Sequence, residues 1–158
     1  MSTNNKISVI LPIKTGKALG FPDFFDKCIQ SVKYQNENIN ELIIVHGSED
    51  LLTNYLKDYD FSGITVTLEL WDKTPNFAKQ VNHGVSISNS NWCSILEFDD
   101  EYSNIWFKNV SKYMDIYKDV DAFLPIVVDI DEKFIFAGFT NEATFAANVS
   151  SEMGILTN

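Results

Sequence analysis

Four acidic side chains follow one short apolar run, and their spacing is typical of a site that binds a cation. Glu97, Asp99, Asp100 and Glu101 lie within five positions at the end of the segment "WCSILEF", residues 92–98. Adjacent carboxylates repel each other unless something positive lies between them. Mg²⁺ and Mn²⁺ favour oxygen ligands and often use one or two protein carboxylates, with substrate phosphates completing the shell. The pair Asp99 and Asp100 therefore predicts a Mn²⁺ or Mg²⁺ site, and the alternative is a solvated acidic turn before a helix.

The acidic residues come at the end of a series of apolar runs that alternate with helical patterns. Apolar and β-branched runs predict strands at residues 7–13, 41–45, 64–70 and 92–98. Apolar residues at helical spacing predict helices at 23–35, 51–59 and 74–88, the last capped by Thr74, and a fourth helix after Ser103. This alternation predicts an α/β fold with a mainly parallel sheet flanked by helices. Ligands of such sheets bind at the carboxyl ends of the strands, where the acids are expected to lie.

The end of the chain shows a different pattern. "AFLPIVVDI" and "KFIFAGF" predict a β-hairpin around Asp131 and Glu132, and the segment 142–153 predicts a helix. With 158 residues, we expect one compact domain over residues 1–158.

Composition excludes several classes of partner. The net charge is −10 with only 12 basic residues, which argues against nucleic acid, because binding phosphate backbones draws on clustered Lys and Arg. No apolar run approaches the roughly 20 residues that span a bilayer, and the polar start "MSTNNK" is unlike a signal peptide, so we expect a cytoplasmic protein without a membrane span. Cys28 and Cys93 lack the spacing of a zinc or redox site and are expected to be buried thiols.

Three ordered blocks give the acids a context. They are "ISVILPIKTG", "FFDKCIQSVKYQNENINELIIVHGSED" and "NFAKQVNHGVSISNSNWCSILEFDD". Over residues 7–100 this set resembles the nucleotide-binding half of family 2 glycosyltransferases, which have the GT-A fold. The residues that fall on the family's patterns are Ser31, Gln35, Glu41, Gly47, Ser48, Asp50, Asn82, Gly84, Asp99 and Asp100.

The resemblance implies a nucleoside-diphosphate sugar as ligand, with a UDP-sugar favoured. The residues it places at the base and ribose are Pro12, Ile13, Lys14, Thr15, His46 and Glu49. It places Lys79 and Asn82, which share a helix face, near the nucleotide-sugar. Glu97, Phe98 and Asp99 occupy the position of the family's D-x-D motif, so Asp99 and Asp100 would hold the Mn²⁺ or Mg²⁺ ion that bridges the diphosphate.

The sequence departs from the family at four points. The usual D-D-G-S is His46-Gly47-Ser48, so His46 or Glu49 would stand in for the aspartate that reads uracil. Glu97 replaces the first aspartate of D-x-D, and Lys14-Thr15 replaces the usual Tyr-Asn. The acceptor half, with the acidic pair that supplies the catalytic base, has no recognised counterpart, so no catalytic residue is assigned.

Two functions follow from this pattern. One is a glycosyltransferase that transfers the sugar or slowly hydrolyses the donor, and the other is a non-catalytic nucleotide-sugar-binding module that acts with a protein partner. Self-association into a homo-oligomer also stays open. A receiver-type signalling domain would need carboxylates after its first strand, and Ile13-Lys14-Thr15 offers none.

Overall fold

The computed structural model describes residues 6–35, 38–125, 128–130 and 136–139. The chain divides into two compact units between Tyr113 and Met114. The expectation of one domain over residues 1–158 stays a prediction.

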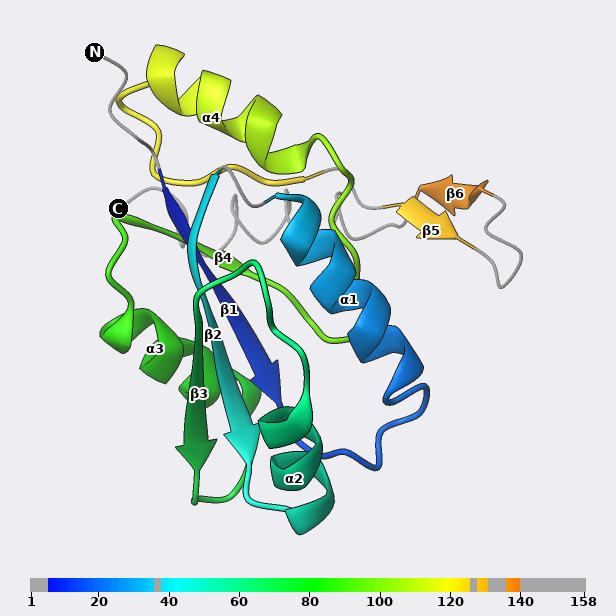
Figure 1. Ribbon diagram of the computed structural model, residues 1–158. Coiled ribbons are helices and arrows are strands. Elements are labelled where there is room, and N and C mark those ends of the chain that lie inside the picture. Colours follow the sequence, from blue (N-terminus) through cyan, green and yellow to red (C-terminus); the bar gives the residue numbers. More distant parts are fainter. Residues whose placement is uncertain (1–5, 36–37, 126–127, 131–135, 140–158) are drawn as a thin grey trace. The chain divides into compact units, whose positions relative to one another are not determined.

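The first unit contains the sheet and its helices (Figure 1). Its strands are β1 (Ile7–Ile13), β2 (Ile39–Gly47), β3 (Val66–Trp71) and β4 (Trp92–Ile95). The helices are α1 (Asp23–Tyr34), α2 (Asp50–Asp58) and α3 (Phe77–Ile87), while α4 (Trp106–Ile116) begins in this unit and ends in the next. In the second unit, β5 (Val128–Ile130) pairs antiparallel with β6 (Phe136–Phe139), as the hairpin prediction requires. The helix predicted at 142–153 lies outside the described residues.

The four-stranded sheet is parallel, which confirms the predicted α/β class. The strand order is β3-β2-β1-β4. Residue Ile13 of β1 is in register with His46 of β2, and Ile10 is in register with Ile95 of β4. The chain moves outward from β1 to β3 and then crosses to the other side of β1 for β4. The order therefore reverses between β1 and β4, which is the point where open α/β sheets bind ligands outside the carboxyl ends of their strands.

Helix α3 covers one face of the sheet and α2 the other (Figure 1). The contact with α3 is close because α3 carries Gly84 there. A Cβ at Gly84 would lie 2.5 Å from Cγ2 of Ile10 and 3.3 Å from Cγ2 of Val45. The two contacted side chains are fully buried, so the absence of a side chain at Gly84 sets the separation between helix and sheet.

Six aromatic rings pack together around the N-terminal part of α1, and we call them the aromatic cluster. Its members are Phe21, Phe25, Tyr55, Tyr59, Phe61 and Phe98. Ring centroids of neighbouring members lie 4.7 to 6.2 Å apart, at the tilted or edge-to-face angles that aromatic pairs prefer. The cluster joins α1, α2 and the segment after β4.

Several element boundaries differ from the sequence prediction; β3 is Val66–Trp71 where 64–70 was predicted, and β4 ends at Ile95 where the predicted strand runs to residue 98. β2 extends from Ile39 to Gly47, longer than the apolar run 41–45, because it pairs with β1 on one side and β3 on the other. The N-cap of α3 is Asn76 and not Thr74, since the Asn76 side chain accepts a hydrogen bond from the backbone N–H of Lys79. In the described part of the chain, no helix is both long and apolar enough to cross a membrane.

Candidate functional site

The acids lie on a segment that we call the acidic loop, residues 97–105, which follows β4 at the carboxyl edge of the sheet. The backbone N–H of Leu96 donates to the carbonyl of Ile10 at 3.0 Å, so the chain stays beside β1 for one residue past the strand. The N–H of Asp100 then donates to the carbonyl of Glu97 at 3.1 Å, which closes a turn. Glu97, Asp99 and Asp100 are all exposed. The turn therefore presents several carboxylates to solvent at the switch point of the sheet.

Two side chains on one face of α1, those of Cys28 and Ser31, and the side chain of its C-cap residue Gln35 hold this loop. The Cys28 thiol donates to the carbonyl of Glu97 at 3.5 Å. The hydroxyl of Ser31 accepts from the backbone N–H of Tyr102 at 3.1 Å. The amide of Gln35 donates to the carbonyl of Ser103 at 2.8 Å and accepts from the N–H of Phe107 at 3.1 Å.

The carboxylates of the acidic loop affect the pKa of a thiol on α1. Burial raises the pKa of the Cys28 thiol, and the carboxylates of Asp100, Glu101 and Asp99 raise it further, because each disfavours a second negative charge nearby. The negative potential of the loop therefore extends into the protein as far as α1. A cation bound at the loop would be attracted by the same potential.

Phe98 is half-buried and packs against a neighbouring aromatic ring. Its ring lies 6.2 Å from the ring of Phe21 in an edge-to-face arrangement, as a member of the aromatic cluster. Tyr102 is fixed as well, because its hydroxyl lies 2.7 Å from the hydroxyl of Ser94 on β4. The aromatic side chains of the acidic loop thus anchor it while its carboxylates stay exposed. A nucleotide-binding role for Phe98 stays a prediction.

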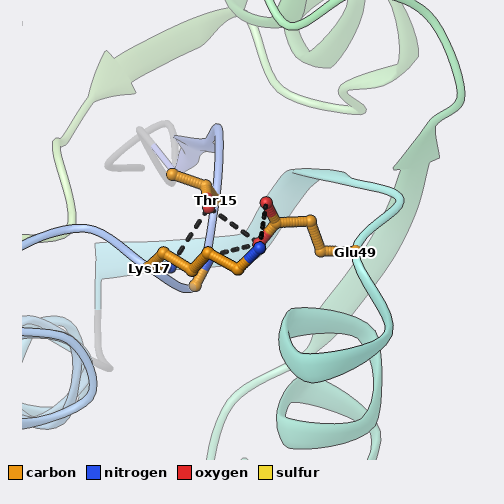
Figure 2. Close-up of polar contacts among 4 residues, drawn as sticks. Thr15, Lys17 and Glu49 are labelled. Atoms are coloured by element: carbon orange, nitrogen blue, oxygen red, sulfur yellow. Dashed lines mark hydrogen bonds and ion pairs between the residues drawn. The ribbon is translucent and has the colours of Figure 1, made fainter.

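A second group of polar residues joins the ends of β1 and β2 (Figure 2). The carboxylate of Glu49 accepts from the hydroxyl of Thr15 at 2.7 Å and from the backbone N–H of Gly16 at 3.2 Å. The hydroxyl of Thr15 in turn accepts from the N–H of Lys17 at 3.1 Å, and the Lys17 ammonium lies 4.0 Å from Glu49. Glu49 therefore fixes the loop that leaves β1, at the same edge of the sheet as the acids.

Of the other four residues predicted to face the base, three are buried and one is exposed. Pro12, Ile13 and His46 are buried, and Nδ1 of His46 donates to the carbonyl of Gly47 at 2.9 Å. Lys14 is exposed. A Cβ at Gly47 would lie 2.4 Å from the carbonyl oxygen of Lys14, so the ends of the two strands approach closely only because position 47 is glycine. Between His46 and Glu49, it is Glu49 that is partly accessible, and base recognition by either residue stays a prediction.

Helix α3 divides its polar residues between two faces. Lys79 and Asn82 are exposed, on the side away from the buried residues Gln80, Val81 and Gly84. Gln80 was not singled out by the sequence analysis. Its side-chain amide donates to the carbonyls of Val45 at 2.9 Å and Ile13 at 3.3 Å. Gln80 therefore joins the ends of β2 and β1. The sequence signal that could have identified it is its position four residues before Gly84, on the same face of the helix.

The side chains of the acidic loop suit a divalent cation. Mg²⁺ and Mn²⁺ prefer oxygen ligands such as the carboxylates of Asp99 and Asp100. Within residues 6–35, 38–125, 128–130 and 136–139, no group of three or more His, Cys, Asp or Glu side chains could hold a metal ion. Two carboxylates leave most of an octahedral shell to other ligands, so a cation here would need water or phosphate oxygens to complete it.

The fold and the site together define a class of protein. A parallel sheet with strand order β3-β2-β1-β4 and carboxylates after β4 is an α/β nucleotide-binding architecture. Residues 8–149 match the family model described as glycosyl transferase family 2. The chain belongs to this family. The match continues to residue 149, past residue 100 where the motifs quoted above end. Among curated proteins no significant match was found.

Solved structures share the fold at low sequence identity. S. aureus TarS 1–349 in complex with UDP-GlcNAc has a TM-score of 0.59 and 15% identity, with 76% of this chain and 37% of that chain covered. HddC from Yersinia pseudotuberculosis has a TM-score of 0.51 and 14% identity, with coverages of 85% and 68%. The 4-diphosphocytidyl-2C-methyl-D-erythritol synthase from Anaerococcus prevotii has a TM-score of 0.50 and 13% identity, with coverages of 89% and 66%. The chain spans little more than a third of the TarS structure.

Proposed function

We propose that this chain binds a UDP-sugar together with a Mn²⁺ or Mg²⁺ ion, and that it acts on the sugar as a glycosyltransferase. The observation that carries the proposal is the acidic loop of a family 2 chain, which presents Asp99 and Asp100 at the carboxyl edge of the parallel sheet. A dianionic diphosphate should bind poorly to a chain of net charge −10 unless a cation offsets the repulsion. Metal dependence therefore follows from charge as well as from the family.

Two further observations favour uridine as the base. Similar structures of S. aureus TarS contain UDP-GlcNAc and UDP. In this chain, the bonds from Thr15 and Gly16 to Glu49 leave a fixed, partly exposed carboxylate beside the ends of β1 and β2. A carboxylate at this edge can accept the ring N–H of uracil, as the missing family aspartate would. We therefore propose Glu49 as the residue that reads the base, with Lys14 free to approach phosphate from the end of β1.

The proposed site acts by holding a positive charge, with its carboxylates, beside the negatively charged diphosphate. When bound, a divalent cation supplies a Lewis acid that neutralises the charge of the departing diphosphate. Asp99 and Asp100 would hold it, and the exposed Glu97 would accept a hydrogen bond from the ribose or from water. The acceptor for the sugar would be a hydroxyl group or, with slow hydrolysis, water.

Calorimetry with UDP and GDP, each with and without Mn²⁺, tests the proposal. We expect Mn²⁺ to strengthen UDP binding, and UDP to bind more than tenfold more tightly than GDP, which corresponds to about 1.4 kcal/mol. Asp99→Ala should abolish the effect of Mn²⁺ and leave the thermal unfolding midpoint nearly unchanged. Asp58→Ala is the matched control, because Asp58 is also exposed but lies in the last turn of α2. Equal UDP affinity with Mn²⁺ and with a chelator would refute the proposal.

Donor turnover separates the enzyme from the binding module. The rate of UDP release from a UDP-sugar panel is measured with and without sugar acceptors, for the wild type and for Asp99→Ala. An enzyme releases UDP faster than the Asp99→Ala variant does. Tight, Mn²⁺-dependent UDP binding combined with equal release by both chains would instead establish a non-catalytic module.

A further inference from the structure

The acidic loop has no helix or strand of its own, yet a metal site needs its carboxylates in a fixed place. Residues 97–105 contain only turns and irregular backbone. What fixes such a segment must be side chains from neighbouring elements, because loops without internal ladders depend on their contacts for order. The polar side chains of α1 and of its C-cap residue contact the loop, and they therefore bear on where its carboxylates lie.

Ser31, on α1, and Gln35, the C-cap residue of α1, are polar residues at buried positions. They are only 4% and 2% exposed. Gln35 follows Ser31 by four positions, at the end of the helix, and both side chains meet the same segment of chain. A buried polar side chain is costly unless it is hydrogen-bonded. Each side chain makes one hydrogen bond to the backbone of the acidic loop, Ser31 at Tyr102 and Gln35 at Ser103.

The bonds of Ser31 and Gln35 bracket the C-terminal half of the loop. The Ser31 hydroxyl donates to the Cys28 carbonyl at 2.7 Å, which orients its oxygen to accept from the N–H of Tyr102 at 3.1 Å. Gln35 bonds the carbonyl of Ser103 with its amide nitrogen and the N–H of Phe107 with its amide oxygen. Two of these four bonds, at Tyr102 and Ser103, reach main-chain atoms of the acidic loop, which side-chain variation in the loop cannot remove.

We infer that Ser31 and Gln35 are positioning residues, which hold the acidic loop so that Asp99 and Asp100 converge on one cation. This inference rests on the proposed function, because it assigns the side chains of Ser31 and Gln35 to the same metal site. Their hydrogen bonds given above all go to the backbone, so in this role neither side chain is a ligand. They act through the backbone at Tyr102 and Ser103, two and three residues after Asp100, so the loop's path is fixed immediately beside its carboxylates.

The alternative is that the hydrogen bonds of Ser31 and Gln35 serve overall stability alone. A matched variant separates this structural role from the positioning role. Ser8 is also a buried serine, with 0% exposure, and its hydroxyl donates to Glu41 at 2.8 Å. It lies near the start of β1, at the opposite edge of the sheet from the acids. Ser8→Ala therefore removes one buried hydroxyl bond without touching the acidic loop.

Hydrogen exchange of the metal-free chain is the first measurement. Ser31→Ala and Gln35→Met should accelerate exchange of the backbone N–H groups of residues 97–107 relative to wild type, whereas Ser8→Ala should leave that segment unchanged. This readout needs no metal, nucleotide or activity. Equal exchange across residues 97–107 in wild type and Ser31→Ala would overturn the positioning role by itself.

Mn²⁺ affinity in the presence of UDP is the second measurement. Partners that orient metal ligands are worth roughly 10-fold or more in metal affinity, so Ser31→Ala should weaken Mn²⁺ binding by about that factor. Gln35→Met, which loses two bonds, should weaken it at least as much, and Ser8→Ala should bind as the wild type does. A weakening by Ser8→Ala equal to that by Ser31→Ala would overturn the inference, because loss of stability would then explain both. A wild-type chain that binds no Mn²⁺ with UDP would instead overturn the proposed function.

Discussion

Replacing Gly84 by alanine sets helix propensity against packing, and the structure indicates which of the two is larger. Alanine in a helix interior is favoured over glycine by about 1 kcal/mol. The new methyl group would, however, lie 2.5 Å from Cγ2 of Ile10, well inside the contact distance, and 3.3 Å from Cγ2 of Val45. Both neighbours are β-branched and fully buried, so their side chains have few other rotamers available. Overpacking of this kind costs about 1–3 kcal/mol, and the short distance places it near the upper end.

We therefore expect Gly84→Ala to lower the free energy of unfolding by about 1–2 kcal/mol, the difference between the packing cost and the propensity gain. Urea denaturation followed by circular dichroism measures it. Ser86→Ala is the control, since Ser86 is exposed on the same helix and its substitution reports propensity without the contact with the sheet. A Gly84→Ala chain that is more stable than wild type would show that α3 moves freely away from the sheet and that the argument is wrong.

Four further substitutions test other contacts of the first unit. Gln80→Met removes the donors to the Ile13 and Val45 carbonyls and should lower the free energy of unfolding in urea by about 2 kcal/mol; a loss under about 0.5 kcal/mol would mean that these bonds are dispensable. Glu49→Ala should cost about 1 kcal/mol through its hydrogen bonds, and Lys17→Ala less than about 0.5 kcal/mol because that ion pair is exposed; the reverse order in urea would contradict this account. Burial, and then the charge of Asp26, raise the pKa of Tyr59 from 10.0 to about 12, so the unfolded chain loses this proton first and stability should fall as pH rises from 10 to 12. Tyr59→Phe should flatten that fall in urea melts, and an unchanged pH profile would refute the assignment.

The strands were predictable because their composition is extreme. Buried parallel strands are continuous apolar runs, and Ile7–Ile13 is buried at every position. Boundaries were harder to predict, since they depend on partners far away in the chain. Both Thr74 and Asn76 are good N-cap residues, and Pro75 fits a first helical turn. The structure instead uses the Thr74 carbonyl to accept from the indole N–H of Trp71 at 3.1 Å.

The position of the acids after the fourth strand could be read from the sequence alone. The cation site that adjacent carboxylates indicate there stays a prediction. The roles of Ser31 and Gln35 could not be predicted, because a serine or glutamine on a helix usually faces solvent, and only the fold brings α1 against residues 102 and 103. His46 is a similar case. The sequence does not show that its place in the second strand buries the ring and uses Nδ1 on the Gly47 carbonyl, and its role in base recognition stays a prediction.

The position of Cys28 makes this side chain an internal probe of the acidic loop. Thiols react with alkylating reagents as thiolates, so a buried thiol with a raised pKa is protected twice. Reaction requires the segment at Glu97, whose carbonyl accepts from this thiol, to move away from α1. In a Cys93→Ser background, the chain would carry one thiol, and its alkylation rate would measure how often the loop opens. A ligand that closes the loop would slow the labelling in proportion to its occupancy, which gives a binding assay that needs neither a chromogenic donor nor turnover.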